Sequence, residues 1–239
     1  MNALVFDIWS DYGHFRKPYT TTSPLTFPFP PRTAMAGIIS AIIGKDKNDV
    51  SCQTQESFIS ISIHPDYPVK KMRVGENLVQ VPKRLQICDL NNIKNKLNQI
   101  RYEFLKDPRY TVYFSHKNPD IYETLKKHLE NHTSVYTPYL GISELIANFE
   151  YLGEFEIKEC TGNGTVELGS VLPKKLLKDN SIELSDNAEY FNTRMPNRMN
   201  NDRVTEEYIE IIFERNGRTI KAKPHKYWQL EDGKNIIFL

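Results

Sequence analysis

Residues 26–44 read Thr26-Phe-Pro-Phe-Pro-Pro-Arg-Thr-Ala-Met-Ala-Gly-Ile-Ile-Ser-Ala-Ile-Ile-Gly44, and this stretch decides how the chain around it is organised. Its prolines exclude a regular helix or an inner strand as far as Pro31. Beyond that point the apolar residues recur at helical spacing, which predicts a helix that Thr33 caps and Gly44 ends. The small residues between the apolar ones make this helix slim, so we expect it to lie flat against a sheet.

Strand-like segments lie on both sides of this helix. Residues 2–9 and 58–63 alternate apolar and polar side chains, and residues 110–114 and 149–159 have the same β-branched and aromatic character. Asn118-Pro119-Asp120 predicts the start of a second helix, which runs to about His132. The resulting order is strand, helix, strand, strand, helix, strand. It predicts an α+β fold of the ferredoxin-like (RRM/RAMP) βαββαβ type.

The rest of the chain divides into an insertion and a C-terminal module. Residues 68–109 are polar and basic, include a helix-like piece at 93–105, and form a thumb-like insertion after the second strand. Residues 160–239 hold three Asn-Gly or Asp-Gly hairpin signals and predict a small antiparallel β module. We therefore expect a ferredoxin-like domain at residues 1–159, followed by this module. The hairpin signals are Asn163-Gly164, Asn216-Gly217 and Asp232-Gly233.

Composition excludes several classes of protein. The chain has 239 residues, of which 39% are hydrophobic and 26% charged, so it is not an intrinsically disordered chain. Its longest nearly apolar run, residues 34–44, is shorter than the ~20 residues of a membrane span, and the N-terminus lacks the pattern of a signal peptide. The three cysteines form no CxxC pair. Reduced thiols in a cytoplasmic protein without a membrane partner are the expectation.

Charge is balanced overall but uneven along the chain. The net charge of +1 gives no global sign of nucleic-acid binding, although a neutral protein can still carry a basic face. Lys83 and Arg84 lie in the basic insertion, which is either an RNA contact or a solvated surface arm. Arg194, Arg198 and Arg203 lie among Asn and Met with little apolar periodicity. That pattern suits a phosphate-facing loop and equally a flexible surface loop.

Residues 10–32 form a long loop rich in Tyr, Thr and Pro. Its aromatic rings offer stacking faces, and its hydroxyls and cations offer phosphate contacts, a combination that suits single-stranded RNA. A Pro-rich loop that only covers the sheet is the alternative, and composition leaves both open. The candidate RNA-binding residues in it are Tyr12, His14, Phe15, Arg16, Lys17, Tyr19 and Arg32.

Histidines supply the remaining candidates for chemistry. His116-Lys117 follows the third strand and has the residue types for metal-free RNA cleavage, a general base beside a cation that stabilises the phosphorane. A polar turn before a helix is the alternative. His128 and His132 share a helix face, but the metalloprotease pattern needs Glu directly after the first His, and here Glu130 comes one place later. We therefore expect neither a metal site nor a cofactor.

Two stretches resemble a known family. The first runs from Tyr12-Gly13-His14-Phe15-Arg16-Lys17-Pro18 through Thr26–Gly44, and it resembles the N-terminal signature of the CRISPR-associated Cas-five family. The second, Tyr136-Thr-Pro-Tyr-Leu-Gly141-Ile-Ser-Glu-Leu145, is similar to that family's glycine loop between the second helix and the last strand. The resemblance covers residues 1–160 well and the C-terminal module only loosely.

The resemblance implies a fold and a role. The family belongs to the RAMP superfamily, and its members are subunits of type I Cascade complexes; this sequence is most similar to the type I-B branch. Such a subunit caps the crRNA 5′ handle, contacts the large subunit and the first backbone subunit, and meets target DNA only through the complex. Gly141 would then let the backbone approach a phosphate closely. This role is non-catalytic and needs no cofactor.

Two other functions remain open at the level of sequence. One branch of the same family, in type I-C systems, cuts repeat RNA with Tyr, Lys and His. Tyr19, His116 and Lys117 supply those residue types here, so a metal-independent endoribonuclease is the first alternative. The second is a general single-strand RNA-binding module unconnected with CRISPR, which composition alone favours.

Overall fold

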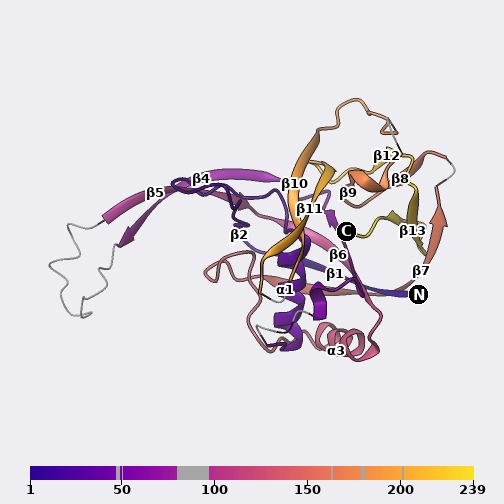
Figure 1. Cartoon of the computed structure of the whole chain (residues 1–239), viewed down its shortest axis with the longest axis horizontal. Helices are drawn as coiled ribbons and strands as arrows, with labels where there is room; N and C mark the ends of the chain where they lie inside the picture. The colour runs from indigo at the N-terminus through magenta and orange to yellow at the C-terminus, as the bar shows by residue number, and fades with distance from the viewer. Residues whose placement is uncertain (47–48, 50, 80–96, 163, 179–180, 201) are drawn as a thin grey trace.

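The structure is a computed structural model that describes the whole chain except residues 47–48, 50, 80–96, 163, 179–180 and 201. A central sheet carries its helices on one side, the C-terminal hairpin at residues 190–214 packs beside the first helix on that same side, and a long two-stranded arm projects from this body (Figure 1). None of the described helices is both long and apolar enough to cross a membrane.

The central sheet has six strands in the order β14-β13-β7-β1-β6-β3, and all neighbours pair antiparallel. Its middle strands pair in a register that places Leu4 opposite Phe114 and Ile8 opposite Tyr110. The four strands that the sequence predicted are present. The strands of this sheet are β1 (Asn2–Trp9), β3 (Ser57–Ile63), β6 (Arg109–His116), β7 (Asn148–Thr161), β13 (Lys226–Leu230) and β14 (Asn235–Ile236).

Two helices connect these strands. Helix α1 (Arg32–Ile43) joins β1 to β3, and α3 (Pro119–Glu130) joins β6 to β7. The predicted ends of the helices are mostly right: Gly44 ends α1 in the left-handed conformation, and the Asn118 side chain accepts the Asp120 N–H at the start of α3. The predicted cap of α1 is wrong. Its N-cap is Pro31, and Thr33 is already the second residue of the helix.

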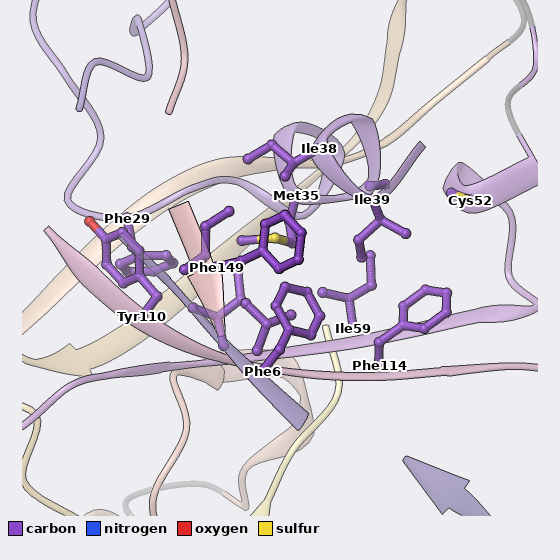
Figure 2. Packing of buried hydrophobic residues seen from close by; sticks show 14 of the residues in the cluster. Phe6, Phe29, Met35, Ile38, Ile39, Cys52, Ile59, Tyr110, Phe114 and Phe149 are labelled. Carbon is purple, nitrogen blue, oxygen red and sulfur yellow. The ribbon is translucent and has the colours of Figure 1, made fainter. Parts of the chain in front are cut away.

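The main core lies between α1 and the sheet. Met35 and Ile39 point from the helix toward Phe6, Ile59 and neighbouring strand residues (Figure 2). The loop 10–32 contributes the buried rings Phe15, Phe27 and Phe29 to the same cluster. This loop is therefore packed onto the body rather than loose, because its aromatics remove apolar surface from water.

The predicted insertion is a β-hairpin arm. Strands β4 (Lys70–Val79) and β5 (Leu97–Lys106) pair along their length, from Lys70 opposite Lys106 to Val79 opposite Leu97. The helix expected at 93–105 is wrong from residue 97 onward, and residues 93–96 lie outside the described residues. Tyr12–Gly13 form the short strand β2, which pairs with the base of the arm.

The C-terminal segments form small sheets that pack on the body. Strand β10 (Tyr190–Met199) pairs with β11 (Thr205–Glu214), which pairs with β9 (Leu172–Pro173); β8 (Val166–Leu168) pairs with β12 (Ile220–Ala222). Two 3-10 turns, η1 (Ser51–Gln53) and η2 (Lys174–Leu176), complete the described elements.

Of the two hairpin signals that lie fully within the described residues, one behaves as predicted. Asp232-Gly233 joins the paired strands β13 and β14. Asn216-Gly217 turns the chain between β11 and β12, which pair with other strands instead. Asn163 lies outside the described residues. The hairpin β13–β14 extends the central sheet through β7, so β7 contacts both halves of the chain.

Candidate nucleic-acid interface

The two signature stretches, far apart in sequence, meet at one cavity of about 410 Å³. Helix α1 forms one wall, the loop at 138–141 a second, Phe15 a third, and the end of the β10–β11 hairpin the fourth. Its volume falls in the usual range of ligand pockets, ~300–1,000 Å³. Its lining residues are Phe15, Thr33, Ala34, Gly37, Ile38, Ala41, Gln53, Pro138, Tyr139, Gly141, Met199 and Arg203.

Helix α1 presents its small residues to this cavity. Met35 and Ile39 face the sheet, while Ala34, Gly37 and Ala41 lie on the cavity side. The sequence analysis expected the small residues to let the helix lie flat on the sheet. Instead, they leave room on the helix's outer side, and a Cβ built at Gly37 meets no atom within 4 Å.

Only glycine fits at position 141, where the loop at 138–141 packs against the backbone of His14 in the first signature stretch. Its φ is +103°, and a Cβ at this position would lie 1.9 Å from the carbonyl oxygen of His14. The neighbouring Leu140 accepts a hydrogen bond from the His14 N–H (2.9 Å), so the two backbones lie side by side. The close approach that the sequence analysis assigned to a phosphate is therefore made to the protein's own backbone.

Arg32 is buried and ties α1 to η1 and to β10. Its side chain is inside the protein, with the residue only 4% exposed, and it donates to the carbonyl oxygens of Gln53 (3.2 Å) and Asn197 (3.2 Å). It donates also to Thr54 (2.8 Å) and Ser57 (2.7 Å). Burial lowers the pKa of this guanidinium to about 10, which leaves it charged at neutral pH. Its prediction as an RNA contact is wrong, because its donors face protein carbonyls.

His14 is likewise an interior residue. It is 2% exposed, its Nδ1 hydrogen-bonds the Glu103 carbonyl oxygen (2.8 Å), and its ring packs against Tyr102 and Phe104 at the base of the arm. Burial lowers the pKa of this imidazole, so the neutral form is favoured. The structure therefore removes His14 from the RNA-contact candidates. Phe15, the next residue, is buried too but lines the cavity.

Three arginines lie at the β10–β11 end, each in a different setting. Arg194 stacks on the Tyr208 ring at 5.2 Å, and Arg198 lies 3.5 Å from a Glu206 carboxylate oxygen. Arg203 lines the cavity in the left-handed conformation, with φ at 62°, and no carboxylate among the described residues pairs with it. Arg203 is thus the cation best placed to meet a phosphate at this cavity.

A second cavity of about 600 Å³ adjoins the first and shares Gln53 and Met199 with it. Its other lining residues are Thr54, Arg198, Asn200, Asp202 and Glu206. Two carboxylates among them make this cavity unsuited to phosphate and suited to hydrogen-bond donors.

The remaining candidates of the N-terminal loop lie apart from the cavity. The Arg16 guanidinium donates to the Thr20 carbonyl oxygen (3.0 Å), and the Lys17 ammonium lies over the rings of Tyr19 and Phe27. Tyr19 is 71% exposed, and the exposed Tyr12 ring meets the edge of Phe104 at the base of the arm. Arg16 and Tyr19 are thus exposed near Lys17, and Tyr12 lies apart from them at the base of the arm. Lys83 and Arg84 lie outside the described residues.

A comparison with known families settles the chain's membership. The model of the family described as CRISPR-associated protein (Cas_Cas5) matches residues 3–212. The chain belongs to this Cas5 family. No curated protein matches the sequence.

Solved structures with the same fold accompany this family match. The chain is similar to a CRISPR protein from Archaeoglobus fulgidus, with 13% identity and a TM-score of 0.59 over 98% of each chain. It is similar also to a chain of a CRISPR RNA-guided surveillance complex, with 13% identity and a TM-score of 0.56, covering 92% of this chain and 91% of that one. At such identities the likeness concerns the fold.

Two of the three candidate nuclease residues of this Cas5 chain, His116 and Lys117, line one cavity, and Tyr19 does not line it. His116 is buried, its Nδ1 accepts the Asn118 N–H (2.9 Å), and its Nε2 faces the Ser51 carbonyl oxygen (3.3 Å). Lys117 is exposed beside it, in a third cavity of about 360 Å³. Tyr19 lies on the N-terminal loop with the Lys17 ammonium over its ring, and it is not among the residues that line the cavity of His116. In this arrangement His116 stabilises the turn before α3.

Two further histidines, His128 and His132, lie at and just beyond the end of α3. Across the part of the chain that the structure describes, no three His, Cys, Asp or Glu side chains gather closely enough to hold an ion. His128 shares a hydrogen bond with the Thr133 hydroxyl (3.0 Å), and the His132 ring stacks on Phe149. His128 lies in α3 and His132 lies beyond its end at Glu130, so the helix face predicted for the pair is wrong. Both histidines have structural contacts instead.

Sequence analysis missed Gln53, Met199 and Tyr139 as cavity residues. Gln53 belongs to the short turn η1 after α1, a segment without periodicity, and Met199 ends a strand that the sequence suggested only as a basic stretch. The one usable signal was the aromatic Tyr139 inside the second signature. The positions of the other two depend on pairing between distant segments.

Proposed function

We propose that this Cas5 chain is a subunit of a CRISPR effector complex, a type I Cascade, in which it holds the 5′ handle of the crRNA without cutting it. One observation carries the proposal: both signature stretches line a single cavity beside Arg203, which pairs with no carboxylate among the described residues. Aromatic and apolar walls suit an unstacked base, and a free cation at the edge suits its phosphate. The type I-B assignment stays a prediction.

The proposal includes a specific fold for the central body, the ferredoxin-like RAMP domain. The strand order β7-β1-β6-β3, with α1 and α3 as the connections, agrees with a ferredoxin-like RAMP domain. The β4–β5 arm then corresponds to the thumb, and residues 164–222 to an added β module, while β13 and β14 extend the central sheet itself. These correspondences support membership in a complex whose subunits share that domain.

Partner contacts are proposed on the surfaces that remain exposed. Tyr136, Tyr139 and Ile146 lie exposed on the segment between α3 and β7, and the arm projects clear of the body. Such apolar surface suits contact with the large and backbone subunits. Target DNA would then meet this chain only through the assembled complex.

A non-catalytic role fits the surroundings of His116. Both of its ring nitrogens already have partners, whereas a general base needs a free nitrogen within reach of the 2′-hydroxyl. The check is incubation of end-labelled repeat RNA with the protein in EDTA. Intact RNA is expected; a single cut that is lost in His116→Ala would make this chain an endoribonuclease and end the non-catalytic proposal.

The binding proposal is tested by fluorescence anisotropy with a labelled single-stranded 5′-handle RNA, across a series of salt concentrations. Arg203→Met is expected to weaken binding and to reduce the slope of log K against log salt by about 0.7, the value of one phosphate contact on a single strand. Lys221→Met is the matched control, since Lys221 is exposed on β12 and paired with Glu167. Equal slopes in both variants would remove Arg203 from the site, and failure of the wild type to bind would end the proposal.

A further inference from the structure

Gln53 is the polar side chain shared by the two adjoining cavities. Its residue is 8% exposed, and its Nε2 donates to the Thr33 carbonyl oxygen (2.8 Å). That bond distinguishes the nitrogen of the carboxamide from its oxygen, because only the NH₂ group can donate to a carbonyl. The carboxamide oxygen is buried and finds no hydrogen-bond partner among the described residues.

The position of Gln53 is rigidly set. Its own carbonyl oxygen accepts from Arg32, and its side chain is fastened to the first turn of α1. A buried acceptor without a partner is costly, so a site that keeps one in a fixed position is ready to receive a donor. Met199, which lines both cavities with Gln53, is unbranched and can change rotamer to admit that donor.

The first cavity has the chemistry of a nucleobase site. Phe15, Ile38 and the small residues of α1 provide apolar walls for an aromatic ring, and the Thr33 hydroxyl adds a polar group on the helix side. Arg203 lies at the same cavity for the phosphate that such a base carries. A single-stranded base fits this combination, because its ring is apolar on its faces and polar at its edge.

We propose that Gln53 determines base specificity: its carboxamide oxygen accepts a hydrogen bond from the exocyclic amino group of a base held in this cavity. Adenine, cytosine and guanine carry such a group. Uracil does not, and the N–H at its pairing edge lies between two carbonyl oxygens that would repel the Gln53 oxygen. The inference rests on the proposed function, because it presumes that the cavity takes RNA.

The test compares short RNAs of defined base content. The probes are labelled ten-nucleotide oligoadenylate, oligocytidylate and oligouridylate, and an oligomer of purine riboside, which is adenosine without its amino group. The wild type is expected to bind oligoadenylate and oligocytidylate roughly five- to tenfold more tightly than the other two, which is the worth of about one hydrogen bond.

The decisive variant is Gln53→Met, which keeps the length of the side chain and removes the oxygen. It is expected to bind all four RNAs within about twofold of the wild type's affinity for oligouridylate, because only the amino-group contact is lost. Gln229→Met is the matched control, since Gln229 is exposed on β13, away from the cavity. It should leave the preference unchanged.

The outcomes separate this inference from the proposed function. A wild type that binds no RNA ends the proposed function. A wild type that binds all four RNAs equally, or a preference that survives in Gln53→Met, ends the specificity assignment while RNA binding stands. Loss of oligouridylate binding in Gln53→Met would also overturn the assignment, since it would show that Gln53 supports the cavity rather than reads the base.

Discussion

The Arg32 guanidinium donates a hydrogen bond to the carbonyl oxygen of Asn197, 165 residues further along the chain. This bond joins the first turn of α1 to strand β10. The same group reaches two residues of the segment that follows η1, so one side chain holds α1, β10 and this segment together beside the cavity. The geometry of the site thus depends on a residue that stays hidden from solvent.

Arg32→Met is expected to lower the free energy of unfolding by about 3–5 kcal/mol, because it leaves several buried carbonyl oxygens without a donor. Urea unfolding followed by circular dichroism measures the loss. Arg194→Met is the control. The Arg194 guanidinium lies exposed over the Tyr208 ring, so its loss is expected to lower the free energy of unfolding by less than about 1 kcal/mol. Equal effects in the two variants would contradict the structural role of Arg32.

Gly141→Ala is expected to destabilise the protein by at least about 2 kcal/mol, since its Cβ would collide with the His14 carbonyl and its backbone favours glycine. Gly37→Ala offers the matched comparison. Gly37 is exposed within a helix and has open space around a Cβ, so alanine there is expected to be stabilising by up to about 1 kcal/mol. Thermal unfolding of the pair provides the measurement, and a tolerant Gly141 would mean that the loop is not held against His14.

Gly37→Leu tests whether RNA enters the cavity without disturbing the stability of the fold. The leucine side chain would extend into the cavity from a helix position that tolerates it, so unfolding should change little while RNA affinity falls roughly tenfold, the worth of one seated base. Anisotropy with the same labelled RNA checks the affinity, and a melting curve checks the fold. Undiminished binding by a well-folded variant would place the RNA elsewhere on the surface.

Glu154 provides a pH-dependent contribution to stability. The Lys126 ammonium, with the amide of Asn2 and the hydroxyl of Tyr122, holds the pKa of this carboxyl at about 2, against 4.5 for a free one. Because the folded pKa is the lower one, the contribution is complete above pH 4.5 and disappears as the pH falls toward 2.

Glu154→Gln should therefore cost about 1 kcal/mol at pH 7, after allowance for partial exposure, and progressively less below pH 4.5. Denaturant unfolding at several pH values gives the comparison. Glu156→Gln, an exposed position on the same strand, serves as the control. A cost that stays constant down to pH 2.5 would rule out the ion pair as its source.

Much of the central body was predictable because its signals are local. The alternation in residues 58–63, the Asn118-Pro119 helix start and Gly44 each act within a few residues, and the structure agrees with all three. Strand β5 was wrongly predicted as part of a helix, because its apolar residues fit both the helical period and the strand period. Leu97, Ile100 and Phe104 fit a helix stripe, while Ile100, Tyr102 and Phe104 fit a strand face, and pairing with β4 decides between them.

The site was predictable only in part, for a different reason. Phe15 and Gly141 were identified from their stretches, and both reach the cavity. Arg32 and His14 looked like surface cations in a Pro-rich loop, since burial of a charged side chain depends on partners that the neighbouring sequence does not reveal. For Arg32 those partners are carbonyl oxygens of the chain after η1 and of β10.

The wall contributed by the β10–β11 hairpin has a consequence for biosynthesis. A ribosome makes both signature stretches well before it reaches Met199 and Arg203, which complete the cavity. A nascent chain that ends short of these residues has the helix and the glycine loop, but neither Met199 nor Arg203. Capture of a ligand in this cavity therefore waits until synthesis has passed residue 203, and a truncated product would not compete with the finished protein for it.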